Sequence, residues 1–286
     1  MQILLAENRG FCPGVRKAIE LAEQALQVYK KVFSLGEIIH NRYVVDKLRK
    51  MGLEIVNSVD EIAKGGVVLI RSHGASPEIF ERAQKRNLTI IDATCVLVKR
   101  AQNIVRQLDN EGYQLVMVGN KNHPEVKGII GYANNVIVIQ NEDDIAKLGK
   151  LKKIGLVSQT TLDRKRFAKI ASLIIEQGFQ EIRIINTLCE QAVGRQRAAA
   201  ELAKKVDVMF VLGGKHSSNT TELANISRNC GTKTFHIEDF SQFTPDMITQ
   251  SCIIGITAGA STPENIVQEF VEGLQKYDTA RESETA

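Results

Sequence analysis

Three of the five cysteines in this sequence, Cys12, Cys95 and Cys189, stand at matching places in a repeated pattern. Each precedes a helix-like stretch and follows a run of strand-forming residues, namely Ile3–Ala6, Leu88–Ile91 and Ile182–Ile185. Three thiolates that meet at one point could hold three irons of a [4Fe–4S] cluster and leave the fourth iron open to a substrate oxygen or water. An open iron would make such a site catalytic.

The spacing after each cysteine indicates that the three positions are equivalent. A second apolar run ends in glycine 24 residues after each cysteine, at Gly36, Gly119 and Gly213. Four residues further on, in a polar loop that opens another helical pattern, the sequence has His40, His123 and Ser217. A repeat of this kind indicates repeated structural units. The repeat favours a cluster, because unrelated core cysteines need not occupy equivalent positions.

The three cysteines could also have a plainer role. A cysteine is often a small buried hydrophobe, and three thiolates can also bind zinc. The spacing leaves both of these roles open. Cys230 and Cys252 fall outside the repeat, and we expect both to be ordinary structural residues.

The loops around the cysteines are rich in hydroxyl, amide and imidazole groups. At helix N-termini such groups can bind a diphosphate without Mg²⁺. No Gly-x-x-x-x-Gly-Lys-Ser/Thr sequence is present, which argues against a nucleotide-hydrolysing P-loop. Taken singly, each residue could equally be a helix cap or a turn residue, but together they indicate a phosphate site. The candidates are His40, His73, His123, Thr160, Ser217, Ser218, Asn219 and Ser261.

One carboxylate, Glu125, lies directly inside one of these loops, beside His123. A carboxyl group shielded from water beside an anionic ligand has a raised pKa and can deliver a proton near neutral pH. Pro124 followed by Glu125 is also an ordinary helix start, so spacing alone does not decide between the two roles.

Strands that alternate with helical segments must position these residues. A third strand follows in each unit, and in parallel α/β sheets ligands collect at the carboxyl ends of the strands. We therefore predict an α/β fold of three small modules with mostly parallel sheets, related by a pseudo-threefold axis around the cluster. The modules are 14–94, 95–188 and 189–276, and we expect the polar residues 277–286 to form a disordered tail.

The composition excludes several classes of protein. The chain has 286 residues, of which 43% are hydrophobic and 24% charged, and its formal charge of +4 is too diffuse to indicate nucleic-acid binding. No apolar run approaches membrane-spanning length, and the N-terminus has no signal-peptide pattern. An odd number of cysteines without a Cys-x-x-Cys pair favours metal or catalytic use in a reducing cytoplasm.

Over nearly its whole length the sequence resembles the 4-hydroxy-3-methylbut-2-enyl diphosphate reductases, iron–sulfur enzymes of the non-mevalonate isoprenoid pathway. The motifs that carry this resemblance are Phe11-Cys-Pro-Gly-Val15, Glu37-Ile-Ile-His-Asn-Arg-Tyr-Val-Val45, Ser72-His-Gly74, Asp92-Ala-Thr-Cys95, Gly119 through His123-Pro-Glu-Val126, Ser158-Gln-Thr-Thr161, Gly213-Gly through Ser217-Ser-Asn219, and Ala258-Gly-Ala-Ser261.

The resemblance implies a trefoil of three α/β domains in which the N-terminal strand, within residues 1–13, joins the third domain. It implies that Cys12, Cys95 and Cys189 bind one [4Fe–4S] cluster. It also implies that all eight polar residues named above bind the substrate, and that all of them except Thr160 hold its diphosphate. Glu125, with His123 and Thr160, would deliver the proton that lets the substrate hydroxyl leave as water. The products would be isopentenyl and dimethylallyl diphosphate, the electron donor a ferredoxin or flavodoxin, and the enzyme a monomer.

Three places depart from the family pattern. Val96 replaces the proline that usually follows the second cysteine, and His216 stands where asparagine is frequent. Cys189 is followed by Glu190-Gln-Ala192 where the family commonly has x-Ala-Thr. These changes bear on cluster potential and loop packing. Two rival functions remain: an enzyme that resembles quinolinate synthase, which needs no external reductant, and a non-enzymatic cluster or zinc sensor.

Overall fold

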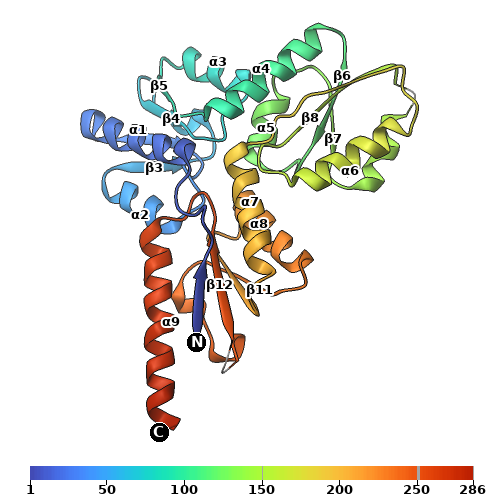
Figure 1. Cartoon of the computed structure of the whole chain (residues 1–286). Helices are drawn as coiled ribbons and strands as arrows, with labels where there is room; N and C mark the ends of the chain where they lie inside the picture. The colour runs from blue at the N-terminus through green and yellow to red at the C-terminus, as the bar shows by residue number, and fades with distance from the viewer. Residues whose placement is uncertain (150, 250–251, 286) are drawn as a thin grey trace. The chain divides into compact units, whose positions relative to one another are not determined.

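The computed structural model describes residues 1–149, 151–249 and 252–285, and its strands form three sheets of four parallel strands each. Helices connect the strands within every sheet (Figure 1). The predicted fold class, three small α/β modules with parallel sheets, is confirmed. None of the helices in the described residues is long and apolar enough to cross a membrane.

The first sheet has the strand order β3-β2-β4-β5. Its strands are β2 (Val32–Leu35), β3 (Leu53–Val56), β4 (Val67–Ile70) and β5 (Thr89–Asp92). The helices of this part of the chain are α1 (Pro13–Tyr29), α2 (Arg42–Lys50) and α3 (Pro77–Lys85), with a short 3₁₀ turn η1 (Val59–Glu61). All four residues of β4 are buried, as expected for a central strand covered on both faces.

The second sheet repeats this order as β7-β6-β8-β9. Its strands are β6 (Gln114–Val118), β7 (Val136–Ile139), β8 (Lys153–Ser158) and β9 (Glu181–Ile184). The helices are α4 (Val96–Asn110), α5 (Pro124–Ile130) and α6 (Arg164–Ile175), with the 3₁₀ segment η2 (Glu142–Leu148).

The third sheet has the order β1-β12-β10-β11, and the N-terminal strand is its edge. Its strands are β1 (Gln2–Leu5), β10 (Val208–Leu212), β11 (Lys233–Ile237) and β12 (Ile253–Ala258). The helices are α7 (Glu190–Ala203), α8 (Ser218–Asn229) and α9 (Glu264–Thr285), with the 3₁₀ turns η3 (Phe240–Gln242) and η4 (Pro245–Met247). β1 pairs in parallel with β12, and the two strands lie side by side in Figure 1.

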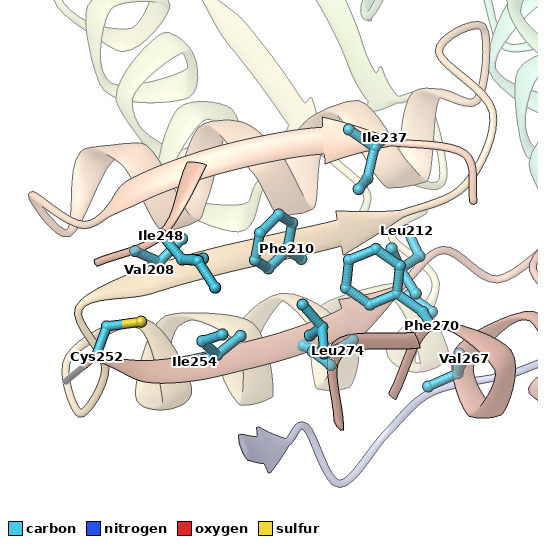
Figure 2. Close-up of a cluster of buried hydrophobic side chains, with 12 residues drawn as sticks. Val208, Phe210, Leu212, Ile237, Ile248, Cys252, Ile254, Val267, Phe270 and Leu274 are labelled. Carbon is cyan, nitrogen blue, oxygen red and sulfur yellow. The ribbon is translucent and has the colours of Figure 1, made fainter. Parts of the chain in front are cut away.

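The hydrophobic core of the third sheet is built around aromatic rings. Phe210 of β10 and Phe270 of α9 are both fully buried, and their ring centroids lie 5.0 Å apart. Figure 2 shows aliphatic side chains of the sheet, such as Leu212 of β10 and Ile254 of β12, in the same cluster as these two rings. The core therefore fixes α9 on the sheet and holds the carboxyl ends of β10 and β12 in place.

The glycine repeat found in the sequence has one structural meaning in all three sheets. β2, β6 and β10 each end at the residue before the glycine. The glycine N–H then donates to the carbonyl that ends the neighbouring strand, at 2.9 Å from Gly36 to Val56, 3.0 Å from Gly119 to Ile139 and 2.9 Å from Gly213 to Ile237. The three positions are therefore equivalent, as the spacing predicts.

The chain divides into two compact units. One comprises residues 13–39 and 43–189 and holds the first and second sheets; the other comprises residues 1–12, 40–42 and those from 190 onward, and holds the third sheet. Residues 40–42 thus belong with the third sheet, although they lie within the first predicted module. The module boundaries 14–94, 95–188 and 189–276 stay predictions.

Residues 277–285, which the sequence assigns to a disordered tail, continue α9 in the structure. The ring of Tyr277 lies 5.3 Å from that of Phe243, and the N-terminal ammonium of Met1 donates to Asp278 at 2.9 Å. No glycine or proline follows Gly273 to end the helix, and the alanine, arginine and glutamate residues there favour it. Low apolar content indicated disorder, but a helix end held by two contacts needs little apolar surface.

Candidate functional site

Each of the three candidate ligand cysteines is the residue directly before a helix. Cys12 precedes α1, Cys95 precedes α4 and Cys189 precedes α7, and all three are partly buried. The partial positive charge of a helix N-terminus favours the thiolate form, which is the form that binds iron. The structure thus gives each cysteine the local setting that the sequence predicts.

The same backbone hydrogen bond anchors all three cysteines. The N–H of Cys12 donates to Ala260 at 3.1 Å, that of Cys95 to Ser72 at 3.0 Å, and that of Cys189 to Thr160 at 2.8 Å. Each acceptor is the second residue after the end of its strand, β12, β4 or β8. Every candidate cluster ligand is therefore tied to a loop that also carries or adjoins a candidate substrate residue.

Glu125 and Thr160 form a buried pair in the second module. Glu125 has only 3% of its surface exposed. The backbone N–H of Thr160 donates to its Oε1 at 2.7 Å, and the hydroxyl of Thr160 donates to its Oε2 at 2.9 Å. Segments 35 residues apart in the chain thus hold this carboxyl group in one position.

Burial raises the pKa of Glu125 above the ordinary value of 4.5, although the hydrogen bonds from Thr160 act in the opposite direction. The protonated form is therefore favoured more than at a solvent-exposed glutamate. In that form the carboxylic O–H can donate to Oγ1 of Thr160, whose own hydrogen then points to a bound ligand. The pair can act as a proton donor and relay.

His123 is the N-cap of α5, and this fixes its protonation. Its Nδ1 accepts the backbone N–H of Glu125 at 3.2 Å, so Nδ1 carries no proton and the ring hydrogen is on Nε2. The ring of His73 meets that of His123 edge to face, with centroids 5.2 Å apart. A neutral Nε2–H group is a suitable donor to a phosphate oxygen.

The remaining candidate residues lie in the unit of the third sheet. Ser217 is the N-cap of α8 and accepts the N–H of Thr220 at 3.4 Å. The hydroxyl of Ser261 donates to the carbonyl of His40 at 3.4 Å. A Cβ at Gly214 would lie 2.7 Å from that same carbonyl, so the segment with His40 packs directly against the loop after β10.

Asn219 gives the strongest sign of a missing ligand in this unit. Only 5% of its surface is exposed, and neither Oδ1 nor Nδ2 of its carboxamide has a hydrogen-bond partner in the described part of the chain. An unsatisfied buried amide costs free energy, and a polar ligand that pairs with it would remove this cost. This fits the prediction that Asn219 and its neighbours bind phosphate oxygens.

Some residues that support the site were not predicted from the sequence. The hydroxyl of Thr187 accepts the N–H of Ser158 at 2.8 Å and donates to its carbonyl at 2.7 Å, and so ties the loop before Cys189 to the end of β8. Arg195 is buried and donates to the carbonyl of Gly10 at 2.9 Å, next to the Cys12 segment. Two signals were available in the sequence. Thr187 is a polar residue two places before Cys189, and Arg195 is a charged residue in the alanine-rich helix α7.

Comparisons with known proteins match the chain over nearly its full length. A protein of Thermoanaerobacter sp. (strain X514) named 4-hydroxy-3-methylbut-2-enyl diphosphate reductase is 42% identical over 281 residues, covering 96% of this chain and 97% of that protein. A protein of Geobacter metallireducens with the same name is 40% identical over 284 residues, covering 99% of this chain and 100% of that protein.

Solved structures give the same result. The E-1-hydroxy-2-methyl-but-2-enyl-4-diphosphate reductase of Plasmodium falciparum superposes with a TM-score of 0.90 at 32% identity, covering 95% of this chain and 87% of that one. A second structure, of (E)-4-hydroxy-3-methyl-but-2-enyl diphosphate reductase, gives a TM-score of 0.69 at 39% identity, covering 96% and 99%. These names confirm the resemblance carried by the sequence motifs. Since the model of the LytB protein family also matches residues 3–275, the chain belongs to that family.

Proposed function

We propose that this chain is an iron–sulfur oxidoreductase that converts (E)-4-hydroxy-3-methylbut-2-enyl diphosphate to isopentenyl diphosphate and dimethylallyl diphosphate, in isoprenoid precursor biosynthesis. The net reaction takes up two electrons and two protons, breaks the allylic C–O bond and releases water. The buried pair of Glu125 and Thr160 beside His123 is the observation that carries this proposal, because the leaving hydroxyl needs a proton donor shielded from solvent.

The proposed cofactor is one [4Fe–4S] cluster per chain, with Cys12, Cys95 and Cys189 as its ligands. The donor set fits, since the three thiols share the same position before a helix and the same backbone anchor. When bound, such a cluster supplies electrons one at a time and an iron with an open position for the substrate oxygen. The chain's own residues supply orientation and protons.

Glu125 is proposed to protonate the leaving hydroxyl through Thr160. The carboxyl group holds its proton because burial raises its pKa, and Thr160 Oγ1, at 2.9 Å, passes the proton on. Loss of the hydroxyl as water, rather than as hydroxide, lowers the barrier to breaking the C–O bond. The second proton goes to the allylic carbon skeleton.

The diphosphate is proposed to be bound by neutral donors instead of a metal ion. His40, His73 and His123 supply imidazole donors, and Ser217, Ser218, Asn219 and Ser261 supply hydroxyl and amide donors. The unsatisfied carboxamide of Asn219 supports this assignment. We propose a ferredoxin or flavodoxin as the electron donor and a cytoplasmic, monomeric enzyme.

The test is an anaerobic assay of the purified full-length chain. We expect about four irons per chain and oxidation of a reduced viologen dye only when the hydroxylated C5 allylic diphosphate is added. Zinc in place of iron would refute the cluster. Turnover of other substrates without a reductant would favour a dehydratase of the quinolinate synthase type.

A further inference from the structure

A second pocket, of about 280 Å³, lies at the carboxyl ends of β2, β3 and β4, within the unit of the first two sheets. Leu35 ends β2, Asn57 follows β3 and Ile70 ends β4, and all three line the pocket. Ligands of parallel α/β sheets bind at this edge. In the described part of the chain, no residue assigned above to the cluster or the diphosphate lines it. The pocket is therefore distinct from the proposed active site.

The guanidinium of Arg71 is the main charge in this pocket. Arg71 directly follows β4, and its Nη1 donates to the carbonyl of Glu37 at 3.3 Å. A Cβ at Gly36 would lie 2.6 Å from Nη1, so the guanidinium rests on the backbone of this glycine. Burial lowers the pKa of Arg71, and the carboxylate of Glu37 acts in the opposite direction without fully offsetting it. A partly desolvated cation in this position is stabilised by an incoming anion.

Other lining residues complete a polar rim and an apolar floor. Lys127, exposed on α5, adds a second positive charge, and the amide side chains of Asn57 and Asn122 add neutral hydrogen-bonding groups. Among the described residues that line the pocket none is acidic. Ile70 and Ile79 add apolar side chains to the lining, and we refer to these apolar lining residues as the apolar floor. The pocket thus combines cations with an apolar surface.

We propose that this pocket binds a short-chain organic phosphate, with its phosphoryl end at Arg71 and Lys127 and its hydrocarbon end on the apolar floor. The volume lies near the lower limit of ligand pockets, about 300 Å³, which suits a small phosphate ester. The inference does not depend on the reaction proposed above.

The position of the pocket links it to the candidate catalytic loops. Gly74, next to His73, and Pro124, between His123 and Glu125, both line it. A Cβ at Gly128 would lie 3.3 Å from the backbone of residues 73 and 74, so α5 packs directly on the other loop. A ligand in this pocket contacts the segment that carries His73 and the segment that carries His123 and Glu125. It therefore reduces the motion of both segments.

The test is calorimetric titration of the anaerobic full-length holoenzyme, without reductant and with the diphosphate site saturated by the hydroxylated C5 allylic diphosphate, with 3-methylbutyl phosphate, inorganic phosphate and 3-methylbutanol. We expect the ester to bind at least about tenfold more tightly than either other probe, because only the ester has both the anionic and the apolar part. Hydrogen exchange should show slower exchange at residues 70–79 and 121–128 when the ester is bound.

Variants separate this pocket from the diphosphate site. Arg71→Gln should weaken ester binding about tenfold or more, since a hydrogen bond to a charged group is lost. Lys127→Gln should weaken it about threefold, as expected for an exposed charge, and it keeps the test valid if Arg71→Gln does not fold. Lys165→Gln, at an exposed lysine on α6, should leave ester binding unchanged. Equal affinity for inorganic phosphate, or ester binding that is insensitive to both pocket variants, would overturn the proposal.

Discussion

Replacing Glu125 by glutamine tests the proposed proton donor with little change in structure. Glutamine has the same shape, its amide oxygen can accept the N–H of Thr160, and its amide nitrogen can donate to Oγ1 of Thr160. Both hydrogen bonds are kept, so the free energy of unfolding should change by less than about 1 kcal/mol. The only function removed is the ability to give up a proton.

The expected loss of turnover follows from that one change. General acid catalysis contributes about 10²- to 10⁴-fold, or about 3 to 5 kcal/mol of transition-state stabilisation. We expect kcat to fall by about this factor in Glu125→Gln. The KM for the substrate should change little, because Thr160 and His123 keep their positions.

The assay is anaerobic oxidation of a reduced viologen dye, with iron content and the unfolding midpoint measured on the same preparation. Full iron content with at least about a hundredfold lower kcat agrees with the proposed role. A kcat close to wild type in a fully loaded variant would refute the reasoning. Loss of iron would show instead that Glu125 supports the cluster segments.

Stability against pH gives a second readout of the same group, independent of turnover. Burial raises the pKa of Glu125 in the folded chain above 4.5, so the folded state binds more protons than the unfolded state between 4.5 and the raised pKa. The stabilisation from this group is therefore complete below about pH 4.5 and is lost as the pH rises through the folded-state pKa. Glu125→Gln should lack this decline. kcat should fall over the same interval in the wild type alone.

Three further substitutions, two of them with a matched control, test the cluster ligands, the core and the repeated glycine. Cys189→Ser should lose iron, whereas Cys230→Ser, outside the repeat, should keep it, as measured by metal analysis. Phe270→Ala removes a fully buried ring 5.0 Å from its aromatic neighbour and should lower the free energy of unfolding by about 3 to 5 kcal/mol in chemical denaturation. Gly213→Ala places a Cβ 2.5 Å from a threonine hydroxyl at a φ of +136° and should cost about 3 kcal/mol, while Gly65→Ala, at a φ of +79° with nothing within 4 Å, should cost about 1 kcal/mol. Equal costs for the two glycines would contradict the steric argument.

The repeat was predictable because it rests on residue types with strict local requirements. A cysteine before a helix and a glycine directly after a strand recur at a fixed spacing that can be recognised in the sequence. In the structure the three cysteines share one backbone hydrogen bond, and the three glycines share another. The strands before the cysteines were also predictable: Ile3–Ala6, Leu88–Ile91 and Ile182–Ile185 lie within one residue of β1, β5 and β9.

The place of His40 was not predictable from the same pattern. The repeat puts it in the first module, yet residues 40–42 belong to the unit of the third sheet. The cause is a close approach of two backbones, in which Gly214 leaves room for the carbonyl of His40. A glycine in a loop has many possible reasons, and its partner is known only after the chain has folded.

The position of Glu125, the candidate acid, also depends on contacts that cannot be recognised from residue types in the sequence. The side chain of Gln159 accepts the N–H of Asn120 at 3.1 Å, and so joins the loop before His123 to the loop that carries Thr160. Glu125 and Thr160 meet across the same two segments. A glutamine between a serine and a threonine reads as an ordinary polar loop residue. Its function arises because one backbone N–H lies opposite it in the folded chain, and this bond holds the proton donor and its relay together before a substrate binds.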